Sequence, residues 1–200
     1  ATVDRTRGER HTFYDRLNHW GAHLRTSRPL LLEAHRAGIA SGDLQFATYA
    51  YSGLVFHWYM TGVPLPDVLA DCDASLALAA RTSNKIVRDI QRSYRQAIRA
   101  LQGHTVSPTS MREDDFDEAA HQAEIADDPI SRTFYEVRKL ELAYLEGDLE
   151  AALGHAANAH AGIAYTAGIA VGVEHVFYEA LTCAALAIAD AARMPLLETA

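Results

Sequence analysis

A short frame that occurs twice constrains this chain more than any other feature. Ser41-Gly42-Asp43-Leu44-Gln45-Phe46-Ala47 returns 105 residues later as Glu146-Gly147-Asp148-Leu149-Glu150-Ala151-Ala152. The glycine supplies the left-handed conformation that ends one helix, and the aspartate caps the next helix by accepting backbone N–H bonds. The alanine that closes the frame is small where two antiparallel helices cross. The offset is close to three tetratricopeptide periods of about 34 residues, so the frame predicts a helical repeat.

Apolar residues at helical spacing surround both copies of the frame. Thr26 and Ser27 are predicted to cap a helix with Pro29 in its first turn. The spacing predicts helix pairs near 28–60, 65–101 and 131–164 and a last helix near 174–192, with a loop over 102–115 and a short helix around 116–125. No segment alternates as a strand does. We therefore expect an all-α fold of tetratricopeptide-like antiparallel helix pairs, stacked as a right-handed solenoid with contacts confined to neighbouring pairs.

Composition narrows the class of protein. The formal net charge of -8 argues against binding nucleic acid through overall charge. No apolar stretch approaches the roughly 20 residues of a membrane span, so we expect no membrane association. Cys72 and Cys183 lie far apart in helical patterns and are predicted to be small buried hydrophobes in a reducing, cytoplasmic setting. Residues 1–200 are expected to form a single helical-repeat segment of a longer protein.

Several segments, in this order, resemble a known arrangement. They are Asn18-His19-Trp20, Pro29-Leu30, Ala37-Gly38-Ile39 leading into 41–50, Gln96 to Gln102 with Gly103-His104-Thr105, Phe116-Asp117-Glu118, Leu140 to Asp148, and 173–181. Together they resemble the helical-repeat region of very large bacterial signalling proteins. Those proteins join a serine/threonine kinase domain, a STAND-type ATPase, this helical region, a GAF sensor and a histidine kinase or other output domain.

The resemblance implies a non-catalytic segment for protein interaction and signal relay, with catalysis in other domains of the parent kinase/ATPase. Its implied partners are those neighbouring domains or a peptide, and no oligomeric state is implied. The sequence has no Gly-rich phosphate loop followed by Lys-Ser/Thr and no His-Arg-Asp loop, so no catalytic residue or cofactor is expected. One departure concerns the second copy of the repeat, where Glu136 and Lys139 take positions that are apolar in a standard tetratricopeptide helix.

Four arginines share one face of the helix over 86–101, opposite its apolar face. This arginine face consists of Arg88, Arg92, Arg95 and Arg99. A solvated helix back is one interpretation, because charged faces opposite apolar ones are common. The other is a docking face, since Arg grips carboxylates and phosphates in a bidentate manner. An acidic partner, or the chain's own acidic run over 113–118, would fit that face.

The helix over 46–59 is rich in aromatic residues and supports a different interpretation. Aromatic side chains at helical spacing are usually core, but they also line ligand pockets. The alternative function is therefore a small-molecule sensor with its pocket beside this helix.

No metal site is expected from the sequence. His19 and His23 are spaced i, i+4 but have no evident third ligand, and His155 and His160 are expected to point to different sides. The acidic run lacks the spaced pattern and central glycine of a calcium loop. Another set, on one predicted helix, consists of Glu174, His175 and Glu179 and is expected to form a capping or interhelical hydrogen bond rather than to perform acid–base chemistry.

Overall fold

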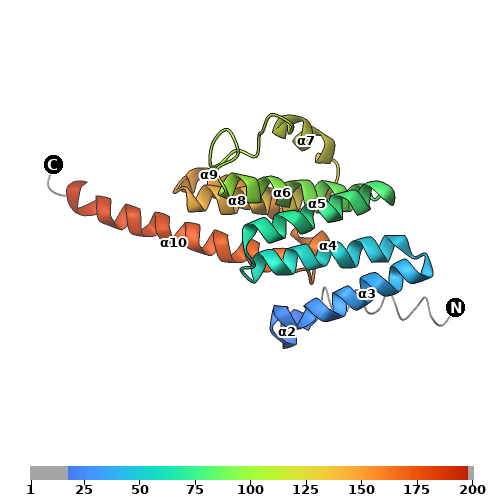
Figure 1. Cartoon of the computed structure of the whole chain (residues 1–200). Coiled ribbons are helices and arrows are strands. Elements are labelled where there is room, and N and C mark those ends of the chain that lie inside the picture. Colours follow the sequence, from blue (N-terminus) through green and yellow to red (C-terminus); the bar gives the residue numbers. More distant parts are fainter. Residues whose placement is uncertain (1–17, 198–200) are drawn as a thin grey trace.

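The computed structural model describes residues 18–197, apart from the side chains of His19 and of residues from 190 on. Every regular element in this part of the chain is helical (Figure 1). An isolated bridge between Glu113 and Phe116 is its only β-type pairing. The elements are α2 Asn18–Gly21, η2 Leu24–Thr26, α3 Ser27–Ser41, α4 Leu44–Met60, α5 Leu65–Arg81, α6 Lys85–Leu101, α7 Glu118–Ile125, α8 Pro129–Leu145, α9 Leu149–His160, η3 Ile163–Thr166 and α10 Val171–Leu197. The prediction of an all-α fold is confirmed.

The repeated frame folds as its sequence predicts. Gly42 and Gly147 have φ angles of 77° and 78°, in the left-handed region that glycine adopts without strain. Asp43 accepts a hydrogen bond from the Phe46 N–H at 3.4 Å, and Asp148 accepts one from Ala151 at 3.1 Å. The closing alanine of each copy, at 47 and 152, is fully buried. Each frame therefore ends one helix, caps the next and lets the two helices pack closely.

Successive helices pack as hairpins. Helix α3 packs on α4, α5 on α6 and α8 on α9, while α4 also contacts α5 and α6 contacts α8. The first two hairpins match the predicted pairs. In the third, α9 ends at His160 instead of 164, because a turn at Gly162 leads into η3. A side chain at Gly162 would clash, since its Cβ would lie 2.0 Å from Thr133 Oγ1.

The core does not keep to neighbouring pairs. Phe56 of α4, Tyr94 of α6 and Phe134 of α8 form one aromatic cluster, with ring centroids 4.9 Å apart for Phe56–Tyr94 and 5.0 Å apart for Phe56–Phe134. The first and third hairpins therefore touch directly. The expectation of contacts between neighbours alone is wrong, because these large rings reach across the hairpin that separates them.

Helix α10 differs most from its prediction. It begins at Val171, three residues earlier than predicted, and runs to Leu197, and Figure 1 shows its C-terminal part extending beyond the other helices. Cys183 lies on this part and is exposed, contrary to its prediction, whereas Cys72 is buried as expected. By length and composition the stretch Val171–Ala189 could cross a membrane, with a mean hydropathy of 1.4, and only 17% of it is buried. The expectation that no apolar stretch approaches the length of a membrane span does not hold for this stretch. The stretch is weak evidence for a membrane span, because Glu174 near its start is ion-paired inside the bundle.

Candidate functional site

The arginine face lies against acidic residues of the chain itself. Arg88 and Arg92 both pair with Glu124 of α7, and Arg92 Nη1 lies 2.9 Å from Glu124 Oε2. Arg95 Nε lies 2.9 Å from Asp73 Oδ1 of α5. These pairs join α6 to the helices on either side of it. Such partly exposed pairs contribute little stability individually, but Arg88 and Arg92 share Glu124 and form a small network with it.

The acidic run contacts the arginine face at its C-terminal end, at Arg99. Arg99 forms a double contact with Glu113, and that hydrogen bond holds the pKa of Glu113 below its usual value. Asp117 caps α7 by accepting hydrogen bonds from Ala119 and Ala120 at 2.9 and 3.1 Å. Glu113 therefore ties the 102–117 loop to α6, and Asp117 fixes the start of α7.

Glu118 anchors the same region from the other side. Its carboxylate accepts hydrogen bonds from Lys139 Nζ at 2.8 Å, Tyr135 Oη at 2.8 Å and the Met111 N–H at 2.9 Å. Burial favours the neutral acid, but Lys139 together with the hydrogen bonds from Met111 and Tyr135 outweighs burial and lowers the pKa of Glu118. Lys139, which departs from the tetratricopeptide pattern, thus holds α7 on α8. Glu136, the other departure, pairs with His155 of α9 at 2.7 Å.

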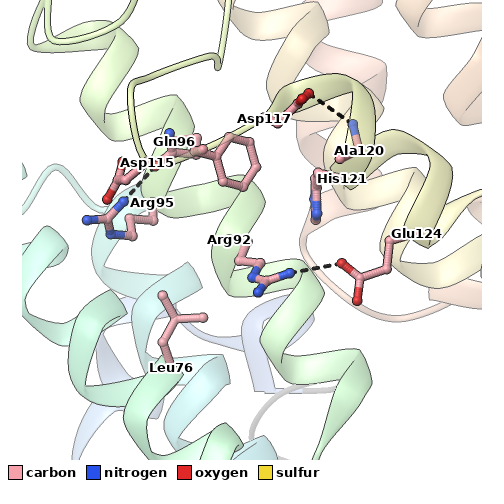
Figure 2. Close-up of a pocket in the computed structure, with 10 residues that line it drawn as sticks. Leu76, Arg92, Arg95, Gln96, Asp115, Asp117, Ala120, His121 and Glu124 are labelled. Carbon is pink, nitrogen blue, oxygen red and sulfur yellow. Dashed lines mark hydrogen bonds and ion pairs between the residues drawn. The ribbon is translucent and has the colours of Figure 1, made fainter.

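Two arginines of the face also line a pocket of about 330 Å³ between α6 and α7. Figure 2 shows Arg92 and Arg95 on its α6 side and His121 and Glu124 on its α7 side, with the Arg92–Glu124 pair across the opening. His121 is buried, its Nε2 lies 3.1 Å from Ser93 Oγ, and its Nδ1 has no hydrogen-bond partner. Burial lowers the pKa of His121 and favours the neutral ring. The pocket therefore offers two cations that are already matched by carboxylates.

A second site is built around Arg138, which is completely buried in α8. Its Nη1 lies 2.9 Å from Glu141 Oε2 and its Nη2 lies 2.7 Å from Glu174 Oε1, although neither contact has hydrogen-bond geometry. The guanidinium carbon lies 4.9 Å from the ring centre of Tyr59 and 4.8 Å from that of Tyr94. Ion pairing and cation–π contact thus compensate this buried charge.

Tyrosine hydroxyls complete the second site. Glu141 accepts hydrogen bonds from Tyr59 Oη at 2.8 Å and Tyr178 Oη at 2.9 Å, and Tyr94 Oη lies 3.4 Å from Glu174 Oε2. Burial opposes the charge on Arg138, but the two carboxylates keep its pKa above the ordinary value. Burial also raises the pKa of Glu174. We call these six residues, with Arg138 at their centre, the Arg138 network.

The Arg138 network borders a pocket of about 260 Å³ at the end of the aromatic helix α4. The pocket is lined by Tyr59, Met60, Glu141, Val173, Glu174, Phe177 and Tyr178. Carboxylates outnumber guanidinium groups here by two to one. Carboxylate oxygens beside aromatic rings suit an organic cation. The predicted aromatic helix therefore does reach a pocket, but only through its last residues.

Sequence reasoning missed the Arg138 network, although a signal for it was present. Arg138 lies four residues from both Phe134 and Leu142, on the buried face of α8. A charged residue in the middle of an apolar face requires a partner, and glutamates at 141 and 174 were available. Of the other predicted positions, His23 accepts a hydrogen bond from the Arg25 N–H at 3.1 Å, and the side chain of His19 lies outside the described residues.

Comparison with protein-family models, curated proteins and solved structures gives no match for this chain.

Proposed function

We propose that this chain is a non-catalytic segment for protein interaction and signal relay in a large multidomain bacterial kinase/ATPase. In this proposal the hairpins α3/α4, α5/α6 and α8/α9 are tetratricopeptide-like units of a right-handed solenoid, and the segment works in the cytoplasm. The identical turn chemistry at Gly42 and Gly147 supports related units. The sequence resemblance supports the parent architecture.

The observation that carries the proposal is the exposed apolar surface at the start of α10. Val176 is 62% exposed and Phe177 is 55% exposed, and Trp20 of α2 adds a third large side chain at 67%. They line an almost wholly apolar groove of about 460 Å³ together with η3 and the residues that follow it. Apolar surface of this kind marks interaction sites.

The proposed occupant is an amphipathic helix from a neighbouring domain of the parent protein. The groove has few polar groups to orient a small polar ligand, whereas the apolar face of a helix needs none. A partner helix there would contact α10. Glu174 of α10 is in turn ion-paired with Arg138 of α8, at the centre of the bundle. A signal at the groove would thereby reach the other hairpins.

Binding of the chain to the flanking ATPase module of the parent, measured with the module's hydrolysis rate, tests the proposal. We expect Val176→Asp to weaken binding at least about tenfold, since a charge would be buried against apolar surface. The matched control is Ile188→Asp, on the same helix, 71% exposed and outside the groove. Equal effects of the two variants, or no binding by the unmodified chain, would contradict the proposal.

The proposal includes the arginine face as a second contact, for an acidic segment of the partner. Since Glu124 already pairs with Arg88 and Arg92, such a segment would compete with Glu124. We expect the double variant Arg92→Gln/Arg95→Gln to weaken partner binding with an unchanged helical circular-dichroism signal, and Glu124→Gln to strengthen it. If all these changes weaken binding alike, the pairs serve only to hold α7. Arg81→Gln, exposed at the end of α5, is the control.

A second candidate function, a small-molecule sensor, is favoured by the pocket beside Tyr59. Its carboxylates and aromatic walls suit a small organic cation. Choline, guanidine and putrescine are suitable probes in a thermal-shift assay. We expect a rise in melting temperature that is lost in Glu141→Gln, because this change removes the charge and leaves a hydrogen-bonding side chain. No shift with any of the three probes would count against the sensor.

A further inference from the structure

Three side chains converge where α9 ends and α10 begins. His160 is the last residue of α9, and His175 and Glu179 are spaced i, i+4 on one face of α10. One potential ligand atom from each residue lies within 4.8 Å of the other two. The rings of His160 and His175 approach edge to face, with centroids 5.7 Å apart.

The hydrogen bond of His175 fixes which nitrogen is available. His175 is buried, and its Nε2 lies 2.9 Å from the carbonyl oxygen of Ala156. A carbonyl only accepts, so Nε2 carries the proton and the neutral ring presents the lone pair of Nδ1. Nδ1 lies 3.9 Å from Glu179 Oε2, too far for a hydrogen bond. A backbone carbonyl behind the ring is one of the common second partners of a metal-ligating histidine.

We propose that His160, His175 and Glu179 form a binding site for a divalent transition metal, with Zn²⁺ as the best fit. Two imidazole nitrogens and one carboxylate oxygen are a common zinc donor set that leaves one coordination position open. Calcium and magnesium are disfavoured, because they take mostly oxygen ligands and more of them. In the described part of the chain Glu179 has no lysine or arginine partner that would neutralise it.

The site requires only a small contraction. Zinc ligands at about 2.0–2.1 Å from the metal lie roughly 3.4 Å from one another in a tetrahedron. The buried ring of His175 is fixed, whereas His160 is exposed and the Glu179 side chain is 37% exposed, so both are free to rotate inward. Bound metal would join α9 to α10 across the 161–170 connection and hold the projecting helix at one angle. The site itself does not depend on the proposed function.

Titration calorimetry and thermal unfolding of the whole chain, first treated with a chelator, test the site. We expect one equivalent of Zn²⁺ to bind and the melting temperature to rise by roughly 5–10 °C at a free zinc concentration of 100 times Kd. Co²⁺ should give the visible absorption of a four-coordinate site. His160→Ala and Glu179→Gln, both at accessible side chains, should weaken binding at least tenfold with an unchanged circular-dichroism spectrum.

Two control variants separate this site from other histidines. His104→Ala removes an exposed loop histidine, and His23→Ala disrupts the i, i+4 pair near the N-terminus; both should bind Zn²⁺ normally. The proposal is overturned if the unmodified chain binds no zinc. It is equally overturned if His160→Ala and Glu179→Gln bind as tightly as the unmodified chain, or if His23→Ala alone abolishes binding.

Discussion

Replacing Arg138 by methionine tests how the bundle tolerates a buried charge. Methionine keeps the unbranched stem but removes the guanidinium that lies between Glu141 and Glu174. Both carboxylates would then be left in the interior without a cation. Removal of one partner from a buried ion pair costs about 3–5 kcal/mol. The lost contacts with two tyrosine rings add to that cost.

The expected loss is large enough to measure in two ways. For a chain of this length, 1 kcal/mol corresponds to about 2–4 °C, so the melting temperature should fall by about 6–20 °C. Urea unfolding followed by circular dichroism should give the same 3–5 kcal/mol from the midpoint, with the slope unchanged.

A second set of variants separates charge from packing. In the triple variant Arg138→Met/Glu141→Gln/Glu174→Gln no unpaired charge is left, and the glutamines keep hydrogen-bonding groups beside the tyrosines. We expect this variant to be more stable than Arg138→Met alone, so the changes should be strongly non-additive. A cost below about 1 kcal/mol for Arg138→Met would refute the reasoning, because a truly buried pair cannot be broken so cheaply. A triple variant less stable than the single one would refute the electrostatic explanation.

Three other changes test particular elements. Gly162→Ala should destabilise by about 1–3 kcal/mol in urea unfolding, because the new Cβ would lie 2.0 Å from Thr133 Oγ1. Gly147→Ala has open space but a φ of 78°, and should cost about 1–2 kcal/mol for placing an L-residue in the left-handed region, with exposed Gly154→Ala as the control. Since the folded-state pKa of Glu118 lies below the ordinary 4.5, its contribution is present above pH 4.5 and is lost as the pH falls through the lower folded value. In Glu118→Gln the decline of the unfolding free energy over that acid range should be smaller.

Local chemistry was readable from the sequence alone. The caps at Asp43 and Asp148, the left-handed glycines before them and the outer bounds of the hairpins α3/α4 and α5/α6 depend on residues a few positions apart. Hydrogen bonds of that range form wherever the local sequence allows them. The end of α9 was predicted four residues too late, because the close contact of Gly162 with α8 has no local signal.

The sequence revealed the positions of the arginine face but not all of its partners, and it did not reveal the Arg138 network. The arginine face was readable, because residues at i, i+4 and i+7 share one side of a helix. Its partner Glu124 was not, because it belongs to another helix. One interpretation of the sequence was that the acidic run over 113–118 binds the arginine face. Glu113 of that run does pair with Arg99.

The sequence by itself thus determined that this protein is helical, where its turns lie and which faces of its helices are apolar. The tertiary structure alone decided that Arg138 meets Glu174, that His160 meets His175 and that α10 leaves Val176 and Phe177 exposed. The physical reason is that side-chain contacts between distant helices depend on how the helices are rotated and shifted against one another. That arrangement is set by packing of the whole core, and no short stretch of sequence encodes it.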